Sequence, residues 1–114
     1  MLYTTPAFIE KNPRTTQALV NAFVRGLGWM QSHSSEEIAR LMPEEYALGD
    51  RELYGRSIRN SLPTYSPDGR FSREGAEIAH RVLRTFDPAV GSAAFDLAKT
   101  YTEAFVDKAP AGRN

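Results

Sequence analysis

The sequence offers few side chains suited to catalysis or metal binding. It holds two histidines, His33 and His80, and no cysteine, so disulfides, thiolate zinc sites, iron–sulfur clusters and cysteine nucleophiles are all excluded. His33 is predicted at a helix C-terminus, where the helix dipole favours a cation, and His80 on the polar face of a later helix. Neither has further ligands at helical spacing. The pattern therefore predicts two surface histidines and no metal site.

Two carboxylate pairs, Glu36 with Glu37 and Glu44 with Glu45, could in principle supply an acid and a base. Adjacent residues of a helix point about 100° apart, so neither pair converges on one substrate. Each pair also falls in the first turn of a predicted helix, where negative charge is stabilised by the helix dipole. We interpret both pairs as helix-start residues rather than catalytic ones.

Two short glycine motifs also fail the tests for known chemistry. Gly91-Ser92 lacks the flanking pattern of a nucleophile elbow. Gly26-Leu27-Gly28 resembles part of a dinucleotide fingerprint, but it lies inside a predicted helix and follows no strand. With no catalytic residue, no metal ligands and no cofactor motif, we predict that the chain is not an enzyme and carries no cofactor.

One junction carries a weak hypothesis of ligand binding. Met1–Thr4 is predicted as a short strand that runs into a helix starting at Thr5 and Pro6. Backbone amides at such a junction can bind an anion, and α/β proteins bind ligands at the carboxyl ends of strands. Thr4 and Thr5 are therefore candidate ligand contacts. The alternative is that Thr5 simply caps its own helix.

Capping residues and prolines divide the rest of the chain into about six short helices. Thr5, Ser34, Asp50, Ser72 and Asp96 are the predicted N-caps, and a further helix starts at Asn12-Pro13. The predicted ranges are 6–11, 13–33, 35–42, 51–62, 73–86 and 97–106, with one turn at 43–46 and a loop from Asp87 to about Phe95.

Helical spacing predicts which faces are buried. The longest helix is expected to bury Leu19, Phe23, Leu27 and Met30, with Val20 and Ala22 beside them, and to expose Gln17 and Asn21. The helix over 73–86 is expected to bury Ala76, Ala79, Val82, Leu83 and Phe86. Two surface ion pairs are predicted at i,i+4 spacing, Glu36 with Arg40 and Glu77 with Arg81.

Length and charge limit the remaining possibilities. The chain has 114 residues, which suits one domain, predicted over residues 1–109 with a disordered tail at 110–114. Fourteen Lys and Arg balance fourteen Asp and Glu, which argues against a nucleic-acid partner, since such proteins need a basic excess. We recognise neither a signal peptide nor an apolar run of about 20 residues, and we expect a soluble chain.

Several short sequence segments, in their order along the chain, resemble the nitrate/sulfonate/taurine-type solute-binding proteins of ABC importers. The resemblance covers residues 1 to about 108 and corresponds to roughly the last third of a typical member. It is carried by Phe8–Pro13, Gln17–Ala22, Ser66–Arg70, Gly75-Ala76, Val82-Leu83, Phe86–Pro88, Asp96-Leu97, Lys99–Thr102 and Phe105-Val106.

The resemblance implies a fold and a role. The fold class expected is mainly α: a short N-terminal strand followed by about six short helices, as a piece of the two-lobed type II periplasmic-binding-protein α/β fold. The parent protein would bind a small polar or anionic solute in the periplasm, of the nitrate, sulfonate, taurine or thiamine-precursor type, and deliver it to a membrane permease. Pyrimidine-synthase-like enzymes share this fold, but they need residues that this chain lacks.

Two readings of the isolated chain stay open. In the first, it is a fragment or truncated relative of such a solute-binding protein, and it should self-associate through exposed apolar faces or through strand Met1–Thr4. In the second, it is a free-standing helical module that binds another protein through the same surface and takes no solute.

Overall fold

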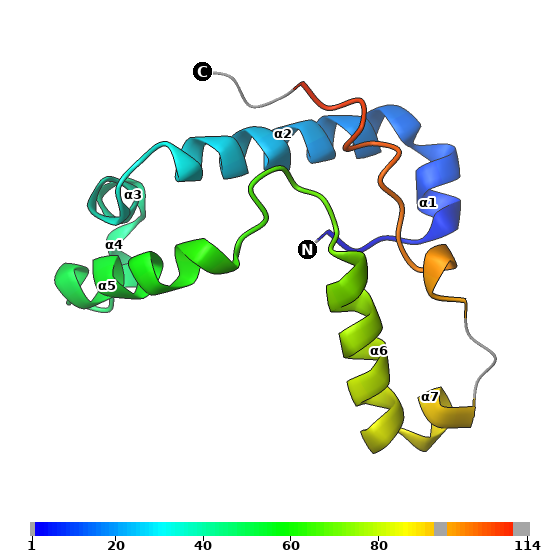
Figure 1. The fold of residues 1–114 in the computed structure, drawn as a ribbon. Helices are drawn as coiled ribbons and strands as arrows, with labels where there is room; N and C mark the ends of the chain where they lie inside the picture. Colours follow the sequence, from blue (N-terminus) through cyan, green and yellow to red (C-terminus); the bar gives the residue numbers. More distant parts are fainter. Residues whose placement is uncertain (1, 93–95, 111–114) are drawn as a thin grey trace.

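The described part of the chain, residues 2–92 and 96–110 of a computed structural model, is built from helices and contains no strand (Figure 1). This confirms the prediction of a mainly α chain. In chain order the elements are α1 (Pro6–Lys11), α2 (Pro13–Gln31), α3 (Ser35–Leu41), α4 (Glu44–Ala47), α5 (Arg51–Ser61), the 3-10 turn η1 (Leu62–Thr64), α6 (Arg73–Phe86), α7 (Pro88–Ser92) and the 3-10 turn η2 (Leu97–Lys99).

The strand predicted at the N-terminus does not form in this structure. Residues 2–5 have no regular secondary structure, and Leu2 and Tyr3 are exposed; Met1 lies outside the described residues. A strand needs a neighbouring strand to take up its backbone N–H and C=O groups. The remainder of the described chain is helical or irregular and offers no such neighbour, which is the physical reason for the difference.

Local capping chemistry accounts for most helix starts, as predicted. The side chain of each predicted cap accepts a hydrogen bond from a backbone N–H in the first turn of its helix. The bonds run from Phe8 to Thr5 at 3.2 Å, from Glu37 to Ser34 at 3.2 Å, from Leu53 to Asp50 at 2.8 Å, from Gly75 to Ser72 at 3.0 Å and from Ala98 to Asp96 at 3.1 Å.

Two predictions near the C-terminus were wrong. The segment after Asp87 was expected to be a loop, yet its first part forms α7, because Pro88 suits the first helical position and Asp87 accepts a bond from the Ala89 amide at 2.9 Å. The last helix was expected to reach Val106, yet η2 spans three residues. The Thr100 hydroxyl donates to the Leu97 carbonyl at 2.7 Å, a local bond that competes with helix continuation.

The helices form two arms that extend from α2 (Figure 1). In one arm α5 packs against α3 and α4, and in the other α6 packs against α7 and η2. The Cα radius of gyration is 17.3 Å. A compact domain of this length has a radius of about 13 Å. The chain is therefore open, with few contacts between the arms.

The buried core is correspondingly small. Five apolar side chains are buried among the described residues: Val24, Ile38, Ala39, Ala47 and Ala76. The chain exposes 8902 Å² of surface. A compact protein of this mass exposes about 6,200 Å². Much of the surface that a compact protein would bury therefore remains in contact with water.

The predicted buried faces are consequently wrong in part. Ala76 is buried, but Val82, Leu83 and Phe86 on the same helix are exposed, since no other described element covers them. On α2, Phe23 is 53% exposed, while Thr16 and Val24 of the same helix are buried.

The covered side of α2 faces the C-terminal segment through a polar residue that was expected to lie in solvent. Gln17 Nε2 donates to the Phe105 carbonyl at 2.8 Å and to Asn21 Oδ1 at 2.8 Å. Thr16 is accommodated beside it because its hydroxyl donates to the Asn12 carbonyl at 3.0 Å. A side of α2 that was expected to face water is therefore hydrogen-bonded within the chain.

Arg70 fastens the C-terminal segment to the turn before α6. Its guanidinium lies 2.8 Å from Asp107 Oδ1, 3.4 Å from Glu103 Oε2 and 3.6 Å from Asp68 Oδ2. The hydrogen bond that Arg70 donates to Asp107, together with the three negative charges, raises the pKa of Arg70. Glu103 also accepts the Phe71 amide at 3.0 Å. We call this group the Arg70 clasp.

Replacing the arginine should release the segment. In Arg70→Met, the three carboxylates lose their shared cation, and we expect faster hydrogen exchange over residues 101–109 with the helices α3 and α5 unchanged. Arg56→Met is the matched control, because Arg56 pairs at 2.7 Å with Glu52 inside one exposed helix. Equal exchange rates in the two variants would show that the clasp does not hold the segment.

Candidate functional site

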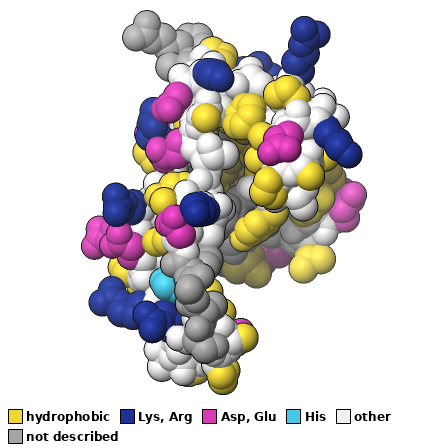
Figure 2. All heavy atoms as spheres, turned by 90° about the vertical axis from the view of Figure 1, so that its right-hand side faces the viewer, with side chains coloured by type: hydrophobic (Ala, Val, Ile, Leu, Met, Phe, Trp, Pro, Cys, Tyr) yellow, Lys and Arg dark blue, Asp and Glu magenta, His cyan; other side chains and the backbone are white. Residues whose placement is uncertain are grey.

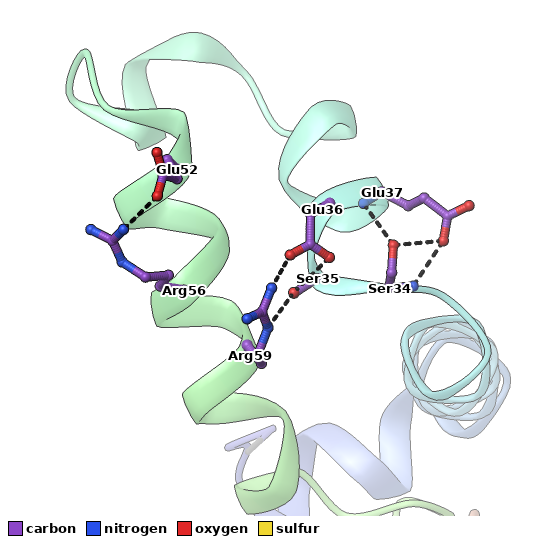
Figure 3. Close-up of polar contacts among 7 residues, drawn as sticks. All are labelled: Ser34, Ser35, Glu36, Glu37, Glu52, Arg56 and Arg59. Atoms are coloured by element: carbon purple, nitrogen blue, oxygen red, sulfur yellow. Dashed lines mark hydrogen bonds and ion pairs between the residues drawn. The ribbon is translucent and has the colours of Figure 1, made fainter.

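The carboxylate pair of α3 is used to build the helix start. Ser34 and Glu37 form a reciprocal capping box (Figure 3). Glu37 Oε2 accepts from the Ser34 amide at 2.8 Å and from the Ser34 hydroxyl at 2.9 Å. The bond from the Ser34 backbone, followed by that from the Ser34 side chain, holds the pKa of Glu37 below its usual range. An acid–base catalyst needs a pKa near the working pH, so this carboxylate is unsuited to the role.

Glu36 points away from Glu37 and toward α5 (Figure 3). It forms an ion pair with Arg59 rather than with Arg40, which corrects the predicted i,i+4 pair. Ser35 joins the contact, since its hydroxyl donates to Glu36 at 3.1 Å and accepts from Arg59 Nε at 3.4 Å. The pKa of Glu36 is lowered, first by its own backbone amide and then by Ser35 and Arg59. The group joins α3 to α5.

These two carboxylates should make the stability of this arm depend on pH. Both have a folded-state pKa below the ordinary value, so they contribute stability that is present at neutral pH and is lost as the pH falls through the folded-state pKa. We expect the helix signal of the wild type, followed by circular dichroism, to weaken on acidification below about pH 4. Glu37→Gln should flatten that dependence, whereas Glu45→Gln, at the start of α4 and outside this group of contacts, should keep it.

The two histidines occupy different surroundings. His33 Nδ1 lies 2.7 Å from the Trp29 carbonyl, and its ring stacks on Trp29 with centroids 4.1 Å apart, so it closes the end of α2. His80 is half-buried and lines a shallow hollow of about 490 Å³ with Glu77, Arg81 and Arg84. Within residues 2–92 and 96–110, no three histidine or carboxylate side chains come close enough to hold a metal ion.

The candidate ligand residues Thr4 and Thr5 both lie on the surface. The Thr5 hydroxyl accepts the Phe8 amide, so it caps α1, as the alternative reading predicted. Neither threonine lines either of the two hollows beside α6. The ligand-binding hypothesis for this junction therefore stays a prediction.

A second hollow, of about 450 Å³, lies between α6, α7 and η2. Its wall is nearly all apolar, and one face of α6 forms part of it. The lining residues are Phe71, Ala76, Ala79, His80, Leu83, Ala89, Val90, Leu97 and Thr100. Phe71 is steadied by Tyr101, whose ring lies 4.7 Å away. The few polar groups here could not orient a small polar solute, which needs several placed hydrogen-bond partners.

The most extensive chemical feature is the uncovered apolar surface itself. Figure 2 shows hydrophobic side chains exposed between charged ones over one face of the molecule. On α2 the exposed apolar residues include Leu19 and Phe23, and on α6 they include Ile78, Val82 and Phe86. Large exposed apolar patches mark interaction surfaces. Sequence reasoning found these residues but assigned them to a core, because periodicity shows which side of a helix is apolar and not what covers it.

Comparison with known proteins adds no assignment. No protein-family model, curated protein or solved structure matches this chain. None of the described helices combines the length and apolar character needed to span a membrane. The proposals below rest on the residues and contacts of the chain.

Proposed function

We propose that this chain is the C-terminal helical part, or a truncated relative, of the substrate-binding component of an ABC importer. The component takes a small polar or anionic solute, of the nitrate, sulfonate, taurine or thiamine-precursor type, and delivers it in the periplasm to a membrane permease. The sequence resemblance suggests the family. The observation that carries the proposal is the uncovered apolar side of α2.

The α2 surface has the character of a helix that covers a further layer of structure. Leu19 and Phe23 are exposed, while Thr16 and Val24 of the same helix are buried by the chain's own residues. An apolar helix surface that is only partly covered has room for a further layer of structure. We propose that the free side of α2 lies on the sheet of the missing α/β lobe.

The N-terminal segment is suited to join the same sheet. Residues 2–4 have no regular secondary structure, and none of their backbone groups takes part in a backbone hydrogen bond recorded within the described chain. A neighbouring sheet edge would satisfy those groups. In that arrangement Thr4 and Thr5 lie at the carboxyl end of the added strand, where α/β proteins contact their ligands.

A second candidate function follows from the same exposed surface. A free-standing helical module could use Leu19 and Phe23 to bind a protein partner without any solute. The two candidates differ in whether solute transport depends on this chain, and transport can be measured directly.

Deletion of the coding sequence should impair uptake of a solute. We expect cells without the chain to take up less of one of three labelled probes, nitrate, taurine or a pyrimidine precursor of thiamine. The wild-type gene should restore uptake, and Phe23→Asp should not, since a charge on the α2 surface prevents packing on an apolar layer. Leu48→Asp is the matched control, because Leu48 is 92% exposed at the end of α4 and should still restore uptake.

Unchanged uptake of all three probes would contradict the transport role and favour the interaction module. Restoration by Phe23→Asp would contradict the assignment of the α2 surface, even if deletion lowers uptake.

The Thr4–Thr5 contact can be tested on the chain itself. Titration with sodium nitrate or taurine, followed by amide chemical shifts, should move the signals of Thr4 and Thr5 if their amides meet the anionic group. Sodium chloride at the same ionic strength is the control. Signals that move equally with all three solutes would show that this junction makes no specific contact.

A further inference from the structure

The two hollows beside α6 adjoin each other and differ in character. The first, of about 490 Å³, is lined by charged residues and a histidine, and the second, of about 450 Å³, is nearly all apolar. His80 lines both of them. Each volume falls in the range of about 300–1,000 Å³ found for small-molecule sites. A charged hollow beside an apolar one suits a ligand with a charged head and an apolar tail.

Helix geometry explains why the two hollows meet at His80. Residues four apart in a helix are offset by about 40° around its axis. Ala76, His80 and Arg84 follow one another at this spacing, so they form a row that turns steadily across the surface of α6. Ala76 lines the apolar hollow and Arg84 lines the charged one. A ligand that lies across this row at His80 therefore reaches into both hollows.

The charged hollow has an excess of positive charge. Arg81 was predicted to pair with Glu77, but Glu77 pairs with Arg73 at 3.1 Å. No ion pair joins Arg81 or Arg84 to the part of the chain that the structure describes. These two arginines are three residues apart, so their side chains are neighbours on the helix surface. Both guanidinium groups can donate to one carboxylate, whose charge offsets the repulsion between them.

The apolar hollow is suited to a hydrocarbon chain. From Ala76 to Leu83 it extends about 10 Å along the axis of α6. Leu83 is 53% exposed, so an apolar chain in the hollow would remove part of this side chain from water. The hydroxyl of Thr100, a polar group of the wall, already donates to the Leu97 carbonyl at 2.7 Å. The wall therefore favours an apolar chain over a polar solute.

We propose that the two hollows together bind a medium-chain fatty acid. Its carboxylate lies between Arg81 and Arg84. Its hydrocarbon tail passes His80 and runs along Leu83 toward Ala76 in the apolar hollow. The site lies on α6, away from the α2 surface, and is independent of the proposed role in solute uptake.

Isothermal titration with four probes tests the two parts of the ligand. Octanoate, kept below its critical micelle concentration, should bind the 114-residue chain saturably. Hexanoate lacks two methylene groups, and we expect its dissociation constant to be about tenfold higher. 1-Octanol keeps the tail and loses the charge, so it should also bind about tenfold more weakly. Acetate has no tail and should give no measurable binding.

A pair of double variants locates the carboxylate. Arg81→Met combined with Arg84→Met should raise the dissociation constant of octanoate about tenfold and leave that of 1-octanol unchanged. Arg14→Met combined with Arg25→Met is the matched control, because both of these arginines are exposed on α2 and the net charge changes by the same amount. The control should leave octanoate binding unchanged.

Filling the apolar hollow should exclude the tail. Ala79→Phe places an aromatic ring in the hollow, and we expect it to weaken the binding of octanoate and 1-octanol alike, by about tenfold or more. Ala79 is exposed, so far-UV circular dichroism should keep the helical signal. Ala18→Phe, at an exposed position of α2, is the matched control and should change neither affinity.

Four outcomes would overturn the proposal. The first is no saturable binding of octanoate to the wild type. The second is equal affinity for octanoate and 1-octanol, which would mean that an apolar molecule occupies the hollow without a charged head. The third is an equal effect of the two double arginine variants, and the fourth is octanoate binding that survives Ala79→Phe. The uptake measurements are read separately, so either proposal can fail alone.

Discussion

The Arg70 clasp is the contact on which the order of the C-terminal third depends. One guanidinium meets carboxylates from its own turn and from the segment around Glu103 and Asp107. The same segment reaches α2 through the bond between Gln17 and the Phe105 carbonyl. The chain buries few apolar side chains, so these polar contacts hold the C-terminal segment in place. In a compact domain a hydrophobic core would do this. Surface ion pairs are individually weak, so the chain holds this segment by several contacts at once.

The arrangement leaves a chain whose helices are locally well specified and whose apolar surface is largely uncovered. Side-chain caps, proline starts and short ion pairs define the helices locally, whereas the large apolar side chains of α6 and two of α2, Leu19 and Phe23, remain exposed. Burial of apolar surface is the dominant favourable term in folding. A chain of this kind gains most of its remaining stability from whatever covers those surfaces, which is why both proposals concern what covers an apolar surface rather than a catalytic pocket.

The polar residues that first suggested chemistry have structural tasks in this chain. Glu37 completes a cap, Glu36 joins two helices through Arg59, and His33 closes the end of α2 against Trp29. A long-range partner, Arg59 of α5, takes the place of Arg40, the local partner predicted for Glu36. Sequence spacing reports neighbours on one helix, while tertiary packing brings in competitors from elsewhere.

The sequence by itself determined the helical character and nearly every helix start, because capping and proline geometry act within four residues along the chain. It also identified the apolar residues correctly. Tertiary structure alone decided which of them are covered: Val24 is buried and Phe23, its neighbour on α2, is not. It also decided that residues 2–5 form no strand here and that Gln17 faces the C-terminal segment. Burial and strand pairing depend on segments far apart in the chain, and no local pattern specifies where those segments lie.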